Sequence, residues 1–179
     1  MSETTTATTA AASTTTATTT TSSIQNYIVY RTVASGAEGV GYVVNRVLWD
    51  GASTFEPGTG LALALDADGA YQIGSTYTPS TEYTLSGAST ATAGTPLTLT
   101  LTPDNDGPDA DTTVTLSDGN AGGTFSAETV TFNGCTNTAQ TVTYTPKAAG
   151  TVTISATNNG SLTNPASLSV TVSAAAAAT

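Results

Sequence analysis

The second half of the chain is built from short segments in which an apolar residue alternates with threonine or serine. The clearest is Thr95 to Thr102, where Leu97, Leu99 and Leu101 are separated by single threonines. Successive side chains of a β-strand point to opposite faces, so this period of two predicts a strand with one apolar face and one hydroxyl-bearing face. An amphipathic helix would need apolar residues three or four positions apart.

Further segments repeat this alternation at regular spacing, with Gly, Asn, Asp and Pro between them. Such spacing predicts an all-β sandwich over Tyr83 to Ser173. The predicted strands, with their inward-facing candidates, are Thr112 to Leu116, Thr129 to Phe132, Thr141 to Thr145 (Val142 and Tyr144), Thr151 to Ala156 (Val152 and Ile154) and Ser167 to Val172 (Leu168, Val170 and Val172).

The charge balance excludes one large class of partners. Only three basic residues, Arg31, Arg46 and Lys147, stand against 13 acidic ones, which gives a formal net charge of −10. Binding of nucleic acid by counterion release requires clustered Lys and Arg, so we expect no nucleic-acid partner. No apolar run approaches the roughly 20 residues of a membrane helix, and the N-terminus lacks the basic start and apolar stretch of a secretory signal, so neither membrane insertion nor a signal peptide is expected.

The residues that most enzymes use are scarce. The chain has one cysteine, Cys135, and no histidine, so a Ser-His-Asp or Cys-His arrangement is excluded within one chain. The glutamates have no recognisable partner carboxylate in the sequence, as acid–base chemistry would require. We therefore expect a non-enzymatic protein without a cofactor, in which Cys135 is an incidental small residue of a turn.

The first 23 residues form a low-complexity arm. From Thr4 to Ser23 every residue is Thr, Ala or Ser, a composition without an apolar face that could offset the entropy lost on ordering. We expect this arm to need contacts with neighbouring molecules, and its deletion to leave a folded sandwich that no longer enters its assembly. Thr4, Thr14 and Thr20 represent it among the predicted assembly residues.

Residues 24–78 show a different pattern, of short β-like runs broken by glycine. Strands are predicted at Asn26 to Val33, Gly41 to Trp49 and Leu61 to Leu65, and a hairpin turn at Asp66 to Gly69 leads to a fourth at Ala70 to Tyr77. A β module this small, without disulfide or metal, needs a partner surface to be stable. Its predicted assembly residues are Ile24, Tyr27, Tyr30, Trp49, Asp50 and Gly51. Residues 79–82 are predicted as a linker and residues 174–179 as an Ala-rich tail.

Two features leave alternatives open. Asp104, Asp106, Asp109 and Asp111 lie on one Gly- and Pro-containing loop, where alternating carboxylates could supply oxygen ligands to calcium. The spacing and bidentate Glu of an EF-hand are missing, and the alternative is a solvated turn at the sandwich tip. Trp49 is either a ligand platform or, as we expect, a packing residue against Tyr77 or a neighbouring subunit.

Two stretches resemble known families. Val44 to Tyr77, with Trp49-Asp50-Gly51, Pro57-Gly58 and Ile73-Gly74-Ser75-Thr76-Tyr77, resembles a short module of phage tail and virion proteins, although Ser75 replaces the usual second Trp. Tyr83 to Val172 resembles bacterial and phage immunoglobulin-like modules, through Ser117 to Phe125, Thr143 to Pro146, Ala149 to Ile154 and Asn158 to Ala166. In this comparison Gly122-Gly123 permits a close approach before Phe125, and Tyr144 supplies a buried aromatic between the sheets.

These resemblances imply display and binding rather than a reaction. Our leading hypothesis is a phage virion protein on the particle surface, a capsid decoration, head-fibre or cement protein, anchored by its N-terminal part to phage capsid proteins. A short tail-fibre or tail-adaptor protein bound to tail proteins is the first alternative, and a cell-surface adhesin or glycan-binding module is the second. In each case we expect a homo-oligomer, with a trimer among the forms considered, and a host-surface glycan as one candidate ligand.

Overall fold

The computed structural model describes residues 23–176, in which every regular element is a β-strand. The arm residues Thr4, Thr14 and Thr20 lie outside this range. The prediction of an all-β fold is confirmed. The strands are β1 (Gln25–Arg31), β2 (Val43–Trp49), β3 (Leu61–Leu65), β4 (Tyr83–Gly87), β5 (Thr90–Thr92), β6 (Leu97–Pro103), β7 (Thr112–Ser117), β8 (Thr124–Phe125), β9 (Thr129–Phe132), β10 (Gln140–Thr145), β11 (Gly150–Asn158) and β12 (Leu168–Ser173).

The strands β1 to β3 form a small antiparallel sheet. We call residues 24–78, which contain this sheet and its loops, the small module. The sheet order is β2-β1-β3, so β1 is central and pairs with both neighbours. The connection from β2 to β3 (residues 50–60) crosses the sheet, because Trp49 lies opposite Gln25 and Leu61 opposite Arg31, at the other end of β1. One face of the sheet packs Ile28, Tyr30, Val43 and Ala64 into the module's core.

The predicted hairpin partner at Ala70 to Tyr77 is wrong, because these residues contain no strand. The carboxylate of Asp66 accepts hydrogen bonds from the backbone N–H groups of Ala70 (2.8 Å) and Tyr71 (3.2 Å), and this closes a compact turn instead. The chain then passes along the edge of β2, where the Gly74 N–H donates to the Val43 carbonyl (2.9 Å). The aromatic residues of this segment fill the module's core instead of forming a strand.

The strands β4 to β12 form a sandwich of two sheets, with orders β4-β6-β10-β8 and β5-β12-β11-β7-β9. The neighbours β4-β6-β10 and β12-β11-β7 follow the A-B-E and G-F-C orders of immunoglobulin domains. The chain changes sheets between β4 and β5, where β5 pairs in parallel with β12. The immunoglobulin-like class predicted for this half is therefore the observed one.

The core of the sandwich is made by the predicted inward residues. The three leucines of β6 are buried, and Val142, Tyr144, Val152, Ile154, Val170 and Val172 are buried with them, whereas Leu168 is half-buried. Tyr144 is fully buried, and an ideal Cβ on Gly123 would lie 2.2 Å from its hydroxyl oxygen. The absence of a side chain at Gly123 therefore gives Tyr144 the space it occupies between the sheets.

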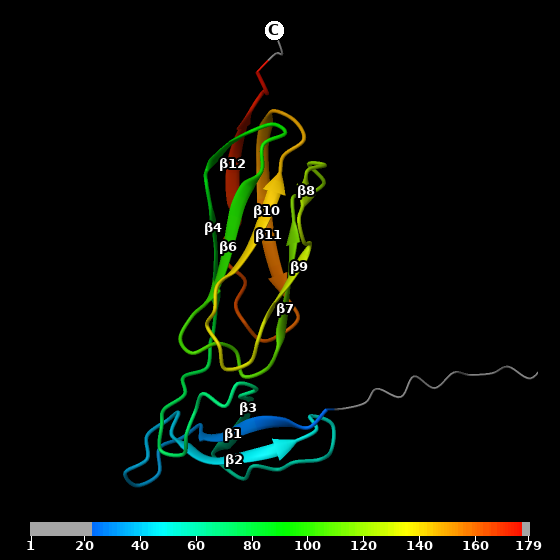
Figure 1. The fold of residues 1–179 in the computed structure, drawn as a ribbon. Helices are drawn as coiled ribbons and strands as arrows, with labels where there is room; N and C mark the ends of the chain where they lie inside the picture. Colours follow the sequence, from blue (N-terminus) through cyan, green and yellow to red (C-terminus); the bar gives the residue numbers. More distant parts are fainter. Residues whose placement is uncertain (1–22, 177–179) are drawn as a thin grey trace, which may run out of the picture.

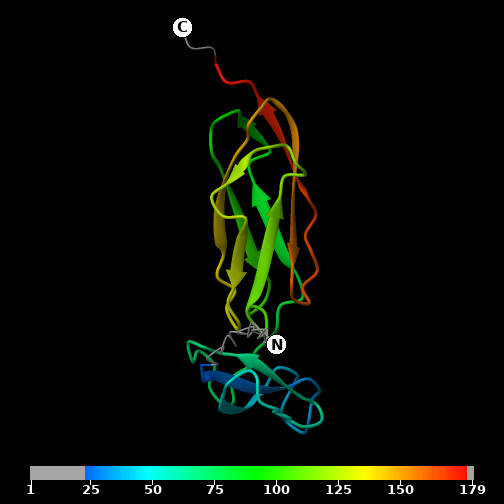
Figure 2. The same cartoon turned by 90° about the vertical axis from the view of Figure 1, so that its right-hand side faces the viewer.

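The small module lies at one end of the sandwich, and its strands run across the sandwich's long axis (Figure 1). The turned view shows the same arrangement, with the chain leaving β12 at the end of the sandwich opposite to the small module (Figure 2). No membrane-spanning helix is present in the part of the chain that the structure describes.

Candidate functional site

Two loops at the tip of the sandwich contact the small module, and we call this contact the joint. The Leu65 N–H donates to the Asp109 carbonyl (2.8 Å), and the Tyr77 hydroxyl donates to the Gly107 carbonyl (3.0 Å). From the second loop, the side chain of Cys135 is buried within the core of the small module. The partner surface that a sheet of three short strands needs is thus supplied, at least in part, by the sandwich of the same chain.

The segment predicted as a linker, residues 79–82, is bound to the first of these loops. The Ser80 N–H donates to the Gly107 carbonyl (2.8 Å), and one carboxylate oxygen of Asp104 accepts from the N–H groups of Thr81 (2.9 Å) and Glu82 (3.2 Å). Ser80 is itself buried. The backbone N–H groups of the connection between the two parts are therefore bound to this loop of the sandwich.

The four aspartates considered for calcium do not converge. Asp104 accepts backbone hydrogen bonds from the linker, Asp106 accepts one from Thr78 (2.7 Å), and Asp111 accepts one from Gly134 (3.0 Å), while Asp109 contributes its carbonyl to Leu65. Within residues 23–176, no three His, Cys, Asp or Glu side chains are arranged to hold a metal ion. The acidic loop is better described as a set of turn-forming carboxylates that organise the joint.

Cys135 lies in a turn, as expected, but its side chain is a packing residue. It is 5% exposed, and burial raises the pKa of its thiol to about 12. The thiolate is the reactive form, so both access and ionisation oppose alkylation in the native state.

We therefore expect Cys135 of the native chain to react with iodoacetamide at pH 8 far more slowly than a free thiol, and at the free-thiol rate in denaturant. A chain with Gly134→Val should react faster under native conditions, because a Cβ at Gly134 would lie 2.8 Å from the Leu65 Cβ and open the joint. Mass spectrometry of the alkylated fraction measures both rates. Rapid native alkylation of the parent chain would contradict the buried position.

The large exposed apolar side chains are unevenly distributed. Among the described residues they are Ile24 (69% exposed), Val33, Val40, Leu48 (72%) and Ile73, and all five belong to the small module. The module makes up about a third of the described chain, whereas the sandwich contributes no such side chain. Single exposed apolar residues are common on soluble proteins, but their confinement to one part marks that part as the candidate contact surface.

Ile24 and Leu48 lie near each other at one end of the module's sheet. Leu48 pairs with Asn26 across the strands, and Ile24 lies two residues before Asn26, on the same side of β1. The half-buried rings of Tyr27 and Trp49 lie at the same end, with their centroids 5.1 Å apart in an edge-to-face arrangement. This end of the module therefore combines exposed aliphatic groups with partly accessible aromatic rings.

The Trp49-Asp50-Gly51 sequence forms a closed turn. The Asp50 carboxylate accepts hydrogen bonds from the N–H groups of Ala52 (3.0 Å) and Ser53 (2.7 Å), and the Trp49 indole N–H donates to Ser53. These backbone bonds lower the pKa of Asp50. Gly51 has φ of +70°, a left-handed conformation that favours glycine. The motif thus starts the crossover loop, and Trp49 packs against Tyr27 and Phe55 rather than against Tyr77.

The predicted assembly residues of the small module differ in their exposure. Ile24 and Gly51 are exposed, and Tyr27, Trp49 and Asp50 are half-buried. Tyr30 is only 6% exposed and packs edge-to-face on Tyr77, so its side chain belongs to the module's core and not to a contact surface. Leu48, Val33 and Ile73 were missed, because an apolar residue within a predicted strand is expected to face inward. Val40 lies just before the predicted strand at Gly41 to Trp49 and was not considered.

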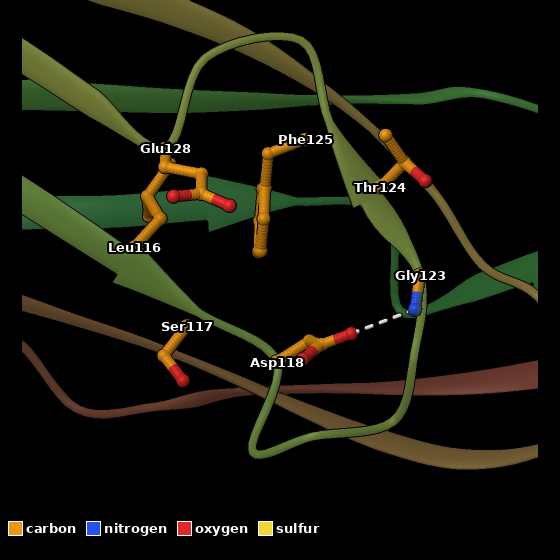
Figure 3. A pocket seen from close by; sticks show the side chains of 7 residues that line it. All are labelled: Leu116, Ser117, Asp118, Gly123, Thr124, Phe125 and Glu128. Carbon is orange, nitrogen blue, oxygen red and sulfur yellow. Dashed lines mark hydrogen bonds between the residues drawn. The ribbon is translucent and has the colours of Figure 1, made fainter.

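A second candidate surface lies on the sandwich, in its half away from the small module. A cleft of about 420 Å³ opens between the end of β7 and β8, lined by Leu116, Ser117, Asp118, Gly123, Thr124, Phe125 and Glu128. The Glu128 carboxylate lies beside the Phe125 ring, and the Asp118 carboxylate lies beyond the lower edge of the ring (Figure 3). Asp118 accepts hydrogen bonds from the Gly123 N–H (2.8 Å) and the Tyr144 hydroxyl (3.0 Å), which fix its position.

Buried tyrosines make the fold sensitive to alkaline pH. Burial raises the pKa of Tyr144 to about 12, with Asp118 adding to the effect, and burial together with Asp109 raises that of Tyr30 to about 12. Because the folded pKa exceeds the ordinary value of 10.0, this stabilisation is complete below pH 10 and is lost as pH rises towards 12. We expect the urea midpoint of unfolding to fall over this range, less steeply for Tyr144→Phe; a constant midpoint would contradict the burial of these rings.

The comparisons with known proteins give limited similarity. No protein-family model matches the chain, and no curated protein matches it. Among solved structures, the chain is similar to the D00-D0 domain of intimin, with 24% identity and a TM-score of 0.37, over 51% of this chain and 46% of that one. It is also similar to domains 4 and 5 of the S-layer protein SbsC, with 18% identity and a TM-score of 0.35, over 65% of each chain. The chain thus spans less than two thirds of either structure, and neither description names a phage protein.

Proposed function

We propose that this protein is a non-enzymatic attachment and display protein of an extracellular surface. The small module binds the underlying assembly, and the sandwich projects from it. The observation that carries this proposal is that, among residues 23–176, all five large exposed apolar side chains belong to the module at one end of the sandwich. Burial of apolar surface is the main driving force of protein association, so contacts at this end are favoured over contacts along the threonine-covered sandwich.

The joint supports these two roles, attachment by the module and projection of the sandwich. Hydrogen bonds from the first sandwich loop and the buried Cys135 side chain of the second hold the sandwich to the module, so a module bound to a surface would orient the sandwich as well. A display protein needs such a connection, because a free linker would leave the projected domain without a defined direction.

Two kinds of assembly fit the geometry. In the first, the protein belongs to a bacteriophage particle, as a capsid decoration, head-fibre or cement protein or as a short tail-fibre or adaptor protein. The resemblance of Val44 to Tyr77 to a phage virion module supports this assignment. In the second, it is an adhesin or structural protein of a cell surface, for which an immunoglobulin-like sandwich is equally suited. Fractionation separates the two: antibody against the sandwich should label purified particles in the first case and the envelope of uninfected cells in the second.

The attachment surface is tested by a charge substitution. The double variant Ile24→Asp with Leu48→Asp should lose attachment to whichever fraction carries the protein, because two carboxylates would have to be desolvated in the contact. Both side chains are exposed, so thermal unfolding should be unchanged. Thr98→Asp, on an exposed position of the sandwich, is the matched control and should attach normally. Unimpaired attachment of the double variant would reject this end of the module as the contact.

A further inference from the structure

We propose that the cleft between β7 and β8 is a binding site for a neutral carbohydrate. The inference goes beyond the attachment role and does not depend on it, since a free chain would bind as well as an attached one. Its volume of about 420 Å³ falls within the range of small-ligand sites, roughly 300–1,000 Å³. The chemistry of the lining is more informative than its size.

The Phe125 ring provides an apolar wall. One side of the ring packs against Tyr144, with centroids 4.7 Å apart, and the residue remains half-buried at the cleft. Because β8 pairs with β10 at Tyr144 and Phe125, the ring is held by the sheet and loses little freedom when a ligand binds. The C–H face of a sugar ring is apolar and stacks on such an aromatic wall.

The polar groups beside the ring include both acceptors and donors. The Asp118 carboxylate accepts from three N–H or O–H groups, those of Asn120 (3.1 Å), Gly123 (2.8 Å) and Tyr144 (3.0 Å). A carboxylate has about four acceptor positions, so Asp118 retains one in a fixed orientation. Glu128 is a further acceptor, and the hydroxyls of Ser117 and Thr124 can donate. Sugar hydroxyls donate and accept at once, and this mixed set matches them.

Charged ligands fit this lining less well. Two carboxylates repel an anion, and the lining contains no basic residue. An ammonium group would pair mainly with Glu128, which is exposed, and an exposed ion pair contributes only about 0–1 kcal/mol. Asp118 keeps its charge, but three of its roughly four acceptor positions are already occupied, so it can accept only one of the hydrogen bonds that an ammonium group offers. A neutral, hydroxyl-rich ligand is therefore the best match.

The position of the cleft also favours an external ligand. In Figure 1, β8 lies in the half of the sandwich away from the small module. A ligand can therefore reach the cleft when the small module is covered by its assembly.

The proposal is tested by amide NMR titration of the ¹⁵N-labelled full chain. A broad array of neutral glycans is screened first. The titration then uses the strongest ligand of the array together with cellobiose, maltose, lactose, mannobiose and diacetylchitobiose. We expect saturable shifts for at least one probe, grouped at Ser117, Asp118 and Gly123 to Phe125, with the amides of the small module unmoved.

Variants connect these shifts to the side chains. Phe125→Leu should abolish saturation by removing the ring, and Glu128→Gln should weaken binding at least three-fold while keeping the spectrum of a folded chain. Glu56→Gln, an equal charge change at an exposed position of the small module, is the control and should bind like the parent. N-acetyl-lysine methyl ester and glucuronic acid serve as cationic and anionic probes.

Four results would overturn the proposal: silence of the cleft amides with every neutral probe, saturation only by the lysine ester, saturation only by glucuronic acid, or unchanged binding by both cleft variants. Since the titration uses the free chain and the attachment experiment involves no sugar, either can fail without the other.

Discussion

Replacement of Tyr77 by alanine is expected to lower the free energy of unfolding of the small module by about 3–5 kcal/mol, the usual cost of removing a fully buried aromatic ring. Tyr77 has no exposed surface, and its ring contacts Tyr30 and Tyr71 edge-to-face with centroids 5.1 and 5.3 Å away. A core of so few residues cannot close over the cavity. Urea unfolding, with amide exchange of β1 and β2 as the local probe, measures the loss.

Two matched variants separate the contributions of Tyr77. Tyr77→Phe keeps the ring and removes the hydroxyl with its hydrogen bond to the Gly107 carbonyl. Because this carbonyl still accepts from Ser80, we expect a cost near the lower end of about 0.5–1.5 kcal/mol. Tyr71→Ala removes a half-buried ring and should cost less than Tyr77→Ala. An alanine at position 77 with near-parent stability would show that the small module is held together by other contacts.

Replacement of Gly107 by alanine is the second change with a large expected effect. Gly107 has φ of +95°, and an alanine in the left-handed region costs about 1–2 kcal/mol. In addition, the new Cβ would lie 2.1–2.4 Å from backbone atoms of Thr136, which cannot move aside as a flexible side chain could. Overpacking of this kind costs about 1–3 kcal/mol more.

Gly94 provides the control, because it also has positive φ (+78°) but no atom within 4 Å of an added Cβ. Gly94→Ala should therefore show the backbone cost alone, and Gly107→Ala should be clearly less stable and should alkylate Cys135 faster. Urea midpoints and alkylation rates measure both. Equal losses in the two variants would mean that the two loops of the joint are not in contact.

The sandwich was predictable because its strands carry a simple period. In β6 the three leucines alternate with threonines, and the structure buries the leucines while the threonines between them remain exposed or half-buried. The same alternation located the inward residues of β10, β11 and β12. In a strand with one buried and one solvent-exposed face, the alternation of apolar and polar residues shows which side chains point inward.

The joint and the segment at Ala70 to Tyr77 were not predictable in this way. The Asp-Gly turn after β3 suggested a hairpin, but the Asp66 side chain caps two backbone N–H groups and redirects the chain. Cys135 gave no sign that it enters the core of another part of the molecule, because a contact between loops has no period. The acidic loop was recognised as turn-forming, yet its partners, 20 or more residues distant, were not readable from composition.

The candidate surfaces divide along the same line. The pattern of β2 predicted apolar residues but did not show that Leu48 is exposed. The exposure of a strand residue depends on whether another segment packs over it, and the strand's own sequence does not state this. At the cleft, the resemblance to immunoglobulin-like modules implied that the two glycines make room before Phe125, but it did not show that Asp118 and Glu128 line the same cleft as the ring. Each surface is formed by residues from separate segments, and no pattern within one segment predicts it.

Site-specific photo-crosslinking tests the central claim, that the small module and not the sandwich contacts the underlying assembly. A photoreactive amino acid is placed singly at Leu48 or Ile73 in the module and at the exposed positions Thr98 or Thr141 in the sandwich, and the fraction that carries the protein is irradiated. Adducts with proteins of the assembly are expected from Leu48 and Ile73 only. Adducts from Thr98 and Thr141, with none from the module, would contradict the account.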